Sequence, residues 1–309
     1  MEKISRRSAL KWMGLGVAAL AFSPYVKADE LARLLEEPML PDPLHPQGPQ
    51  GMPRLNYQEK EVYSGPDVII RQIDEHTWEG NGHLMANETI YLVEGNDRAL
   101  LIDAGTKIDD LDKIIAGITR KPVTLVATHV HPDHTGSAIH YFPEIWIDAA
   151  DEVNVPMFMK DYKGKVNYFE DGQVFDLGGR RIEVIFTPGH TPGSVTFFEM
   201  EGDRKWGYSG DAFGSGNLLL TTNFSTLLAT TTRIEAYMKR HGIEKMYPGH
   251  YMGSNPETLQ RIMDLKKMSA EMIDGTRQSV PAERPQMGLN GRIRDYGVNI
   301  SYRDPEGLK

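Results

Sequence analysis

The chain has 309 residues, enough to bury one large core or two modest ones, and its formal net charge is −9. Such a balance disfavours an extended nucleic-acid partner. The absence of cysteine excludes disulfides, thiolate metal ligands and lipoprotein attachment. A single α/β domain with segments attached at its ends fits this length better than two domains.

Residues 1–28 are typical of an export signal. Arg6 and Arg7 precede an apolar run from Trp12 to Phe22, a pattern that resembles a twin-arginine signal and is too short for a comfortable membrane span. Cleavage after Ala28 would remove five basic residues and one acidic residue, which changes the net charge from −9 to −13. We therefore expect an exported protein, periplasmic or secreted, without a stable membrane span after signal removal. An uncleaved amphipathic anchor is the alternative.

Residues 29–66 are expected to form an arm or linker, because a short helical pattern at Glu30 to Glu37 gives way to a stretch rich in Pro, Gly and Gln. The main domain is then expected over residues 67–268. Its first half predicts strands at Val68 to Ile73, Thr77 to Glu79, Glu88 to Glu94 and Ala99 to Asp103, and a helix at Ile108 to Thr119.

Four potential metal ligands follow the next predicted strand, Val123 to Ala127. They are His129, His131, Asp133 and His134, and Pro132 argues against a helix through them, although a helix can begin over Thr135 to Tyr141. In such a turn, the first two histidines can point toward one ion and Asp133 and His134 toward a second. Imidazole and carboxylate ligands without thiolate suit zinc, and also iron, manganese or cobalt.

The second half of the domain continues with alternating strands and helices. Strands are predicted at Ile145 to Asp148, Gln173 to Leu177, Arg180 to Phe186, Val195 to Met200 and Lys205 to Tyr208, and helices at Ala150 to Lys160, Thr226 to His241 and Pro256 to Met268. The tail, residues 269–309, shows no clear periodicity and is expected to be irregular.

Three of the later strands end in further candidate ligands. His190 follows a Pro-Gly turn, Asp211 follows Gly210, and His250 follows a second Pro-Gly turn. An aspartate at a strand end is commonly a turn or cap residue and means little alone. The recurrence of the pattern after the clustered motif predicts that these side chains converge on one metal centre.

The seven residues, in this order and spacing, resemble the metallo-β-lactamase fold superfamily of hydrolases, and are closest in pattern to its glyoxalase II-like and lactonase-like members. The resemblance covers roughly residues 67–268. It implies an α/β fold, a four-layer αββα sandwich of two mixed β-sheets flanked by helices. It also implies two divalent metal ions, with zinc favoured over iron or manganese: His129, His131 and His190 would hold the first, Asp133, His134 and His250 the second, and Asp211 would bridge them.

This ligand set implies hydrolysis of a small-molecule substrate by a hydroxide shared between the two ions, with Asp133 hydrogen-bonding the nucleophile as the catalytic carboxylate. Similar flavodiiron proteins carry Glu where this chain has His131, and true β-lactamases of the superfamily generally lack the bridging Asp. We therefore expect cleavage of an ester-like bond, a thioester or a lactone. The alternatives are a β-lactam or phosphodiester substrate, a diiron oxidoreductase and a non-catalytic metal-binding protein. The sequence assigns no oligomeric state.

Other residues near the predicted strand ends have supporting roles in this interpretation. Asp103 either orients a ligand histidine or stabilises a turn. Asn81, His83, Tyr251 and the loop Phe213 to Leu219 are expected to form walls of the substrate pocket, and His83 is not expected to be a ligand because the ligand set is complete without it.

Overall fold

A computed structural model describes residues 57–199 and 204–308 of the chain. The expected export signal, the short helical pattern at 30–37 and most of the expected arm lie outside the described residues. The strand β1 (Lys60–Ser64) lies within residues 29–66, where an arm or linker is expected, and it pairs antiparallel with β2 (Val68–Asp74). Within the described residues, no helix combines the length and the apolar character that a membrane crossing requires.

The first sheet has eight strands, which neighbour one another in chain order. The strands after β2 are β3 (Thr77–Gly82), β4 (Thr89–Glu94), β5 (Ala99–Ile102), β6 (Val123–Val126), β7 (Glu144–Ile147) and β8 (Lys165–Tyr168). Strands β1 to β5 are antiparallel, whereas β5 to β8 run parallel. Because parallel strands point the same way, the segments that leave β5, β6 and β7 emerge at one edge of this sheet.

The second sheet has six strands in the order β15-β14-β12-β11-β10-β9. Their bounds are β9 (Val174–Asp176), β10 (Arg181–Phe186), β11 (Val195–Glu199), β12 (Trp206–Gly210), β14 (Lys245–Pro248) and β15 (Glu257–Thr258). Strands β12 and β14 pair in parallel, so the residues that follow them, Asp211 and His250, emerge at the same edge.

Three buried clusters show how the layers stack. Leu101 and Leu125 pack with Leu111 of helix α4 (Leu111–Ile118) on the outer face of the first sheet. The alternate residues of the same sheet face the second sheet across a core that contains Leu100, Val126, Phe197 and Tyr208. Residues on the far face of the second sheet, such as Phe198, pack against the helices α6 (Phe224–His241) and α7 (Leu259–Asp274).

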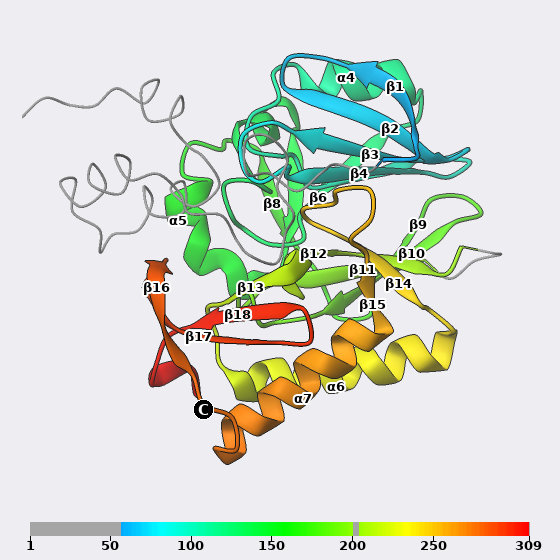
Figure 1. Cartoon of the computed structure of the whole chain (residues 1–309). Helices are drawn as coiled ribbons and strands as arrows, with labels where there is room; N and C mark the ends of the chain where they lie inside the picture. The colour runs from blue at the N-terminus through cyan, green and yellow to red at the C-terminus, as the bar shows by residue number, and fades with distance from the viewer. Residues whose placement is uncertain (1–56, 200–203, 309) are drawn as a thin grey trace, which may run out of the picture.

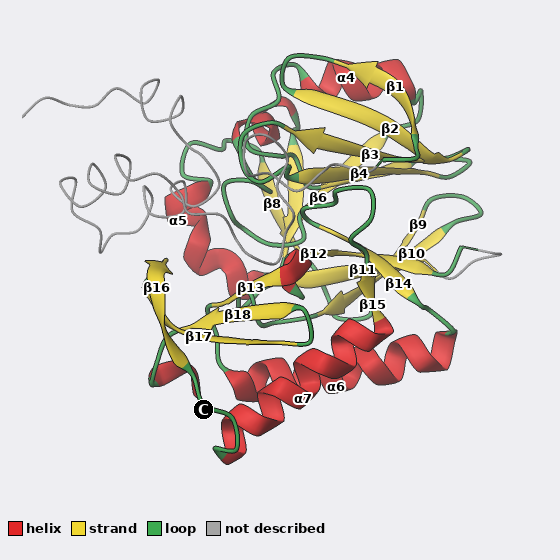
Figure 2. Ribbon diagram, in the orientation of Figure 1, coloured by secondary structure: helices red, strands yellow, loops and turns green. Residues whose placement is uncertain are grey.

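This arrangement confirms the predicted four-layer αββα sandwich. Figure 1 shows α4 over the first sheet and α6 and α7 beneath the second sheet, and Figure 2 shows the strands between these helices. The segment predicted as one helix at Ala150 to Lys160 is a 3₁₀ helix over Ala149–Asn154 followed by the four-residue helix α5 (Val155–Phe158).

The expectation of an irregular tail is wrong. Residues 280–302 form three strands, β16 (Val280–Gln286), β17 (Leu289–Asp295) and β18 (Val298–Tyr302), and β18 pairs in parallel with β13 (Asn217–Leu220) to complete a third sheet. Ile293 and Ile300 of this sheet pack into the cluster beneath the second sheet. The tail carries few apolar residues, and its partner strand β13 lies far earlier in the chain, so the local pattern gives a weak strand signal.

Candidate metal centre

The fold brings all seven predicted ligands together in two groups. The nitrogen atoms of His129, His131 and His190 lie within 4.8 Å of one another, and one ligand atom each from Asp133, His134, Asp211 and His250 does so in the second group. Asp211 faces both groups, because its Oδ2 lies 3.7 Å from His190 Nε2 and 3.2 Å from His250 Nε2. The two groups contain the ligands that the resemblance assigns to each ion, and Asp211, which clusters with the second group, also lies close to the first.

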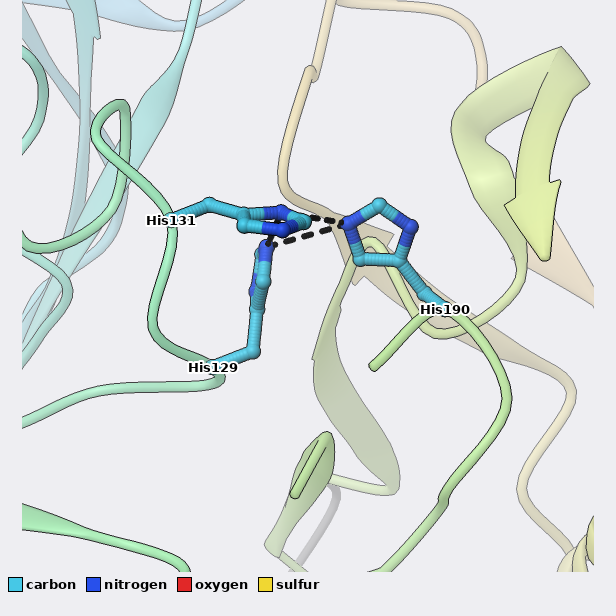
Figure 3. Close-up of side chains that lie close together, drawn as sticks. All are labelled: His129, His131 and His190. Carbon is cyan, nitrogen blue, oxygen red and sulfur yellow. Dashed lines mark hydrogen bonds between the residues drawn. The ribbon is translucent and has the colours of Figure 1, made fainter. Parts of the chain in front are cut away.

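The three-histidine group is a tight, buried triangle (Figure 3). His129 Nε2 lies 3.1 Å from His131 Nδ1, which lies 2.9 Å from His190 Nε2, and His190 Nε2 lies 3.2 Å from His129 Nε2. Each of the three side chains is at most 6% exposed. Water therefore has little access to the nitrogen atoms that face one another.

Partners on the outer side of two rings set the tautomers of this group. His190 Nδ1 donates to the Leu219 carbonyl oxygen at 2.8 Å. His129 Nδ1 lies 3.1 Å from Thr128 Oγ1, whose own hydroxyl donates to Asp103, so the ring donates to the hydroxyl oxygen. The inward Nε2 atoms of both rings therefore carry lone pairs, and lone pairs at this separation repel unless a cation lies between them.

In the four-residue group, buried nitrogen and oxygen atoms without hydrogen-bond partners face one another. His134 Nε2 lies 3.6 Å from Asp211 Oδ1 and 3.8 Å from Asp133 Oδ2, and neither His134 Nε2 nor Asp211 Oδ1 has a hydrogen-bond partner although both are buried. His250 Nε2 also faces Asp133 Oδ2, at 3.5 Å. Because buried polar atoms are normally satisfied, these orphaned atoms fit a divalent cation that would take both as ligands.

The pKa values divide the histidines into two sets. Burial, followed by the neighbouring imidazoles, lowers the pKa of His129 and His131 well below the ordinary value. Burial also acts to lower the pKa of His134 and His250, but Asp103, Asp133 and Asp211 outweigh it for His134, and Asp211 and Asp133 do so for His250. The pKa rises to about 10 for His134 and about 9 for His250. In the metal-free protein, the carboxylate-rich group therefore holds protons where a cation would otherwise lie.

Metal uptake near pH 8 is expected to release about two protons, because His134 and His250 must become neutral to bind a cation. Calorimetric titration with Zn²⁺ in buffers of different ionisation enthalpy measures this number, and a heat that does not depend on the buffer would contradict it.

The raised pKa values of His134 and His250 also stabilise the metal-free fold. Since both folded pKa values exceed the unfolded value, this stabilisation is complete below about pH 6.5 and is lost as the pH rises through 9 to 10.

Asp103 links both ligand groups from the end of β5. Its carboxylate accepts hydrogen bonds from the Thr128 backbone N–H at 2.7 Å, from the Thr128 hydroxyl at 2.8 Å and from His134 Nδ1 at 2.7 Å. The residue has a φ of 65°, in the left-handed region, which aspartate tolerates better than most residues. Both interpretations offered for Asp103 therefore hold: it stabilises the turn, and it orients His134 directly and His129 through Thr128.

The segment that carries His250 is held by a polar network at the end of β3. His250 Nδ1 lies 3.1 Å from the Ala86 carbonyl oxygen. The carbonyl oxygen of the next residue, Tyr251, accepts hydrogen bonds from the side chains of Tyr57, Asn81 and Asn87. Asn81 and Tyr251, expected as pocket walls, are thus buried supports of His250. His83 is exposed and belongs to neither ligand group.

The third sheet supports His190. Leu219, whose carbonyl oxygen accepts from His190 Nδ1, lies on β13, inside the loop that was expected to line the pocket. Strand β13 is fixed by pairing with β18 in the tail. The backbone N–H of Thr221, just after β13, also donates to the His190 carbonyl oxygen. The carboxy-terminal strands therefore contribute to the position of a ligand that lies far from them in the sequence.

Two residues beside the ligand groups, Gly249 and Asp151, make contacts that the sequence analysis did not predict. A Cβ atom on Gly249 would lie 2.3 Å from Asp211 Oδ1 and 2.7 Å from His134 Cε1, so only glycine fits beside these two side chains. Asp151, on the 3₁₀ helix after β7, accepts hydrogen bonds from the segments on both sides of the three-histidine group. Its place just after a strand that runs parallel to β6 was the signal that could have identified it.

Comparison with known proteins agrees with this geometry. Residues 86–250, just over half of the chain, match the model of the metallo-beta-lactamase superfamily. The chain is 28% identical over 214 residues to acyl-coenzyme A thioesterase MBLAC2 of Homo sapiens, an alignment that covers 56% of this chain and 76% of that protein. It is also 28% identical over 141 residues to hydroxyacylglutathione hydrolase GloC of Haemophilus influenzae, covering 39% of this chain and 63% of that protein.

A solved structure supports the fold alone. The crystal structure of a metallo beta lactamase from Erythrobacter litoralis with beta mercaptoethanol in the active site superposes with a TM-score of 0.50 and 19% sequence identity, covering 68% of this chain and 99% of that one. The family match, the thioesterase and glyoxalase II-like relatives and the two groups of potential ligands agree with one another. The chain therefore belongs to the metallo-beta-lactamase superfamily and is a metal-dependent hydrolase.

Proposed function

We propose that this protein is a dinuclear metal-dependent hydrolase that cleaves a thioester or a lactone in a small molecule. The observation that carries the proposal is the carboxylate of Asp211. It faces the three-histidine group through His190 and the second group through His250, and its other oxygen atom is buried without a hydrogen-bond partner. A carboxylate that lies close to both groups of candidate ligands suits a site for two cations.

Thioesters are the substrate class that the relatives favour. Acyl-coenzyme A thioesterase MBLAC2 and the atrochrysone carboxyl ACP thioesterase of Aspergillus fumigatus are named as thioesterases, and the latter is 24% identical over 215 residues, covering 68% of this chain and 65% of that protein. The carbonyl carbon of a thioester and the carbonyl carbon of a lactone react with the same nucleophile, so one site can act on either bond. Thioesters are therefore the first substrates to test.

Two divalent cations would polarise the carbonyl oxygen of the substrate and acidify a bound water molecule. Zinc suits a donor set of imidazole and carboxylate without thiolate, and iron and manganese are the alternatives. The side chains have separate tasks around this pair. Asp133 would accept a hydrogen bond from the attacking water. Its Oδ2 lies 3.5 Å from His250 Nε2 in the second group, and 12% of its side chain remains exposed to solvent. Asp103 and the Leu219 carbonyl oxygen accept hydrogen bonds from Nδ1 of His134 and His190. The Nε2 atoms, which face inward, are therefore left to bind the cations.

A substrate panel with metal analysis tests the proposal. Purified protein would be analysed for metal content and assayed against an acyl-coenzyme A, an acyl-glutathione thioester, a lactone, a chromogenic cephalosporin and bis-nitrophenyl phosphate. We expect two ions per chain and cleavage of a thioester or the lactone that is lost after chelation and restored by Zn²⁺. Protein that is loaded with two ions but cleaves only the cephalosporin or the phosphodiester would contradict the substrate class. Saturation at one ion would contradict the dinuclear site.

We also propose that residues 1–28 direct export by the twin-arginine route. The support is the sequence alone, Arg6 and Arg7 before the apolar run. Replacing both arginines with lysine keeps the charge and is expected to leave the protein in the cytoplasmic fraction. A periplasmic fraction equal to that of the unchanged chain would contradict this proposal.

A further inference from the structure

The buried carboxylate of Asp151 lies outside both ligand groups, yet it contacts the backbone of both segments that carry the three histidines. Its Oδ2 accepts from the Val130 backbone N–H at 2.7 Å, and Val130 stands between His129 and His131. Its Oδ1 accepts from the Gly193 backbone N–H at 2.8 Å, in the turn that follows His190. The side chain is fully buried.

A hydroxyl next to the third histidine completes this arrangement. Thr191 Oγ1, one residue after His190, donates to Asp151 Oδ2 at 2.9 Å. The Asn154 side-chain amide lies 3.4 Å from Oδ1, so each carboxylate oxygen has two donors around it. Burial raises the pKa of Asp151 above its ordinary value, although the backbone N–H groups of Val130 and Gly193 act to lower it. Donors on every side of the carboxylate suit its ionised form, which only accepts hydrogen bonds.

The local backbone is shaped around this carboxylate. A Cβ atom on Gly193 would lie 2.5 Å from the Asp151 backbone nitrogen and 2.7 Å from its Cβ, so the second turn can approach Asp151 only because Gly193 has no side chain. The two segments otherwise belong to different sheets, since His129 and His131 follow β6 and His190 follows β10. Asp151 therefore joins the two sheets beside the triangle of nitrogen atoms.

We infer that Asp151 is a positioning residue that sets the separation of the three histidines and thereby the affinity of this group, and not of the other, for its metal ion. The inference rests on the metal site proposed above. The second group has no contact of this kind with Asp151: its ligands are held by Asp103 and by the network around Tyr251. Loss of the Asp151 carboxylate should therefore affect the two ions unequally.

Replacing Asp151 with asparagine would keep the shape but place an amide donor against groups that also donate. Residues that orient metal ligands typically change metal affinity by about 10-fold to 100-fold when replaced. We expect D151N to weaken one Co²⁺ site by about that factor and to leave the other within about 2-fold of the unchanged protein. Titration of metal-free full-length protein with Co²⁺, followed by visible absorption and calorimetry, measures both affinities.

Three further variants assign the effect. H190A removes a ligand of the three-histidine group, so the spectrum of its single remaining Co²⁺ should match that of D151N at one equivalent. D148N makes the same chemical change at the N-cap of the same 3₁₀ helix, where the Asp148 side chain accepts from Ala150 N–H, and it should bind both ions normally. T191V removes one donor to Asp151 and should weaken the same ion by a smaller factor, which keeps the test available if D151N does not fold.

The outcomes separate this inference from the proposed function. Two normal affinities in folded D151N, or an equal loss at both sites, would overturn the positioning role, because a general loss of stability does not choose between the ions. If the unchanged protein binds fewer than two Co²⁺ ions, the dinuclear proposal fails instead.

Discussion

Replacing Asp211 with asparagine is expected to lower hydrolytic turnover by more than about 100-fold, beyond the range typical of residues that only orient ligands. Asp211 is the one residue of the described chain whose oxygen atoms face ligands of both groups: Oδ1 lies 3.6 Å from His134 Nε2, and Oδ2 lies 3.7 Å from His190 Nε2. Asparagine keeps one oxygen atom but loses the negative charge that two cations would share. We therefore also expect fewer than two ions per chain, measured by elemental analysis after dialysis.

Two comparisons make this result specific. Asp161 is an exposed carboxylate outside both ligand groups, so D161N makes the same chemical change and should retain two ions and full turnover.

The second comparison is the titration of metal-free protein. Burial raises the pKa of Asp211, but His250 and His134 outweigh burial and hold the pKa well below its ordinary value. Removal of this charge should therefore lower the pKa of both histidines. D211N with two ions and normal turnover would contradict a bridging role.

Replacing Glu199 with alanine is expected to lower the free energy of unfolding by about 3–5 kcal/mol, the usual cost of breaking a buried ion pair. Glu199 and Arg180 form a two-point contact at 2.7 and 2.6 Å, and their side chains are 0% and 5% exposed. Arg180 also donates to the carbonyl oxygen atoms of His76, in the turn between β2 and β3, and of Glu94, at the end of β4. Without Glu199, a buried guanidinium between the two sheets would lose its counterion.

Urea denaturation of metal-chelated protein measures this effect without a contribution from bound ions. The matched control is D74A, which breaks the Arg204–Asp74 pair, where the two atoms lie 2.8 Å apart and the side chains are 32% and 24% exposed. More exposed pairs of this kind contribute about 1 kcal/mol or less. Replacing Arg180 with methionine and Glu199 with leucine together should recover part of the loss, because the pair is then removed as a whole. A loss in E199A no larger than that in D74A would contradict the prediction.

The elements of the sandwich follow largely from local sequence patterns. Strands β4, β5 and β10 begin and end within a residue or so of the predicted ranges, because each packs apolar side chains and has turn-forming residues such as glycine, asparagine, aspartate or proline nearby. The tail was predicted less well. Strand β18 pairs with β13, and residues of β17 and β18 pack in one cluster with α6 and α7, but the local pattern does not show that these segments meet.

At the candidate site, too, some features follow from the local sequence and others depend on contacts between distant segments. The sequence by itself determined the seven potential ligands, because clustered histidines and aspartates at the ends of strands are a local pattern, and the resemblance divided them into two groups. Only the tertiary structure decided what holds them. The carbonyl oxygen of Leu219 reaches His190 because the tail fixes β13, and Asp151 reaches Val130 and Gly193 because two sheets meet there. Ligand identity is a property of single residues, whereas ligand orientation depends on contacts between segments that are distant in the chain.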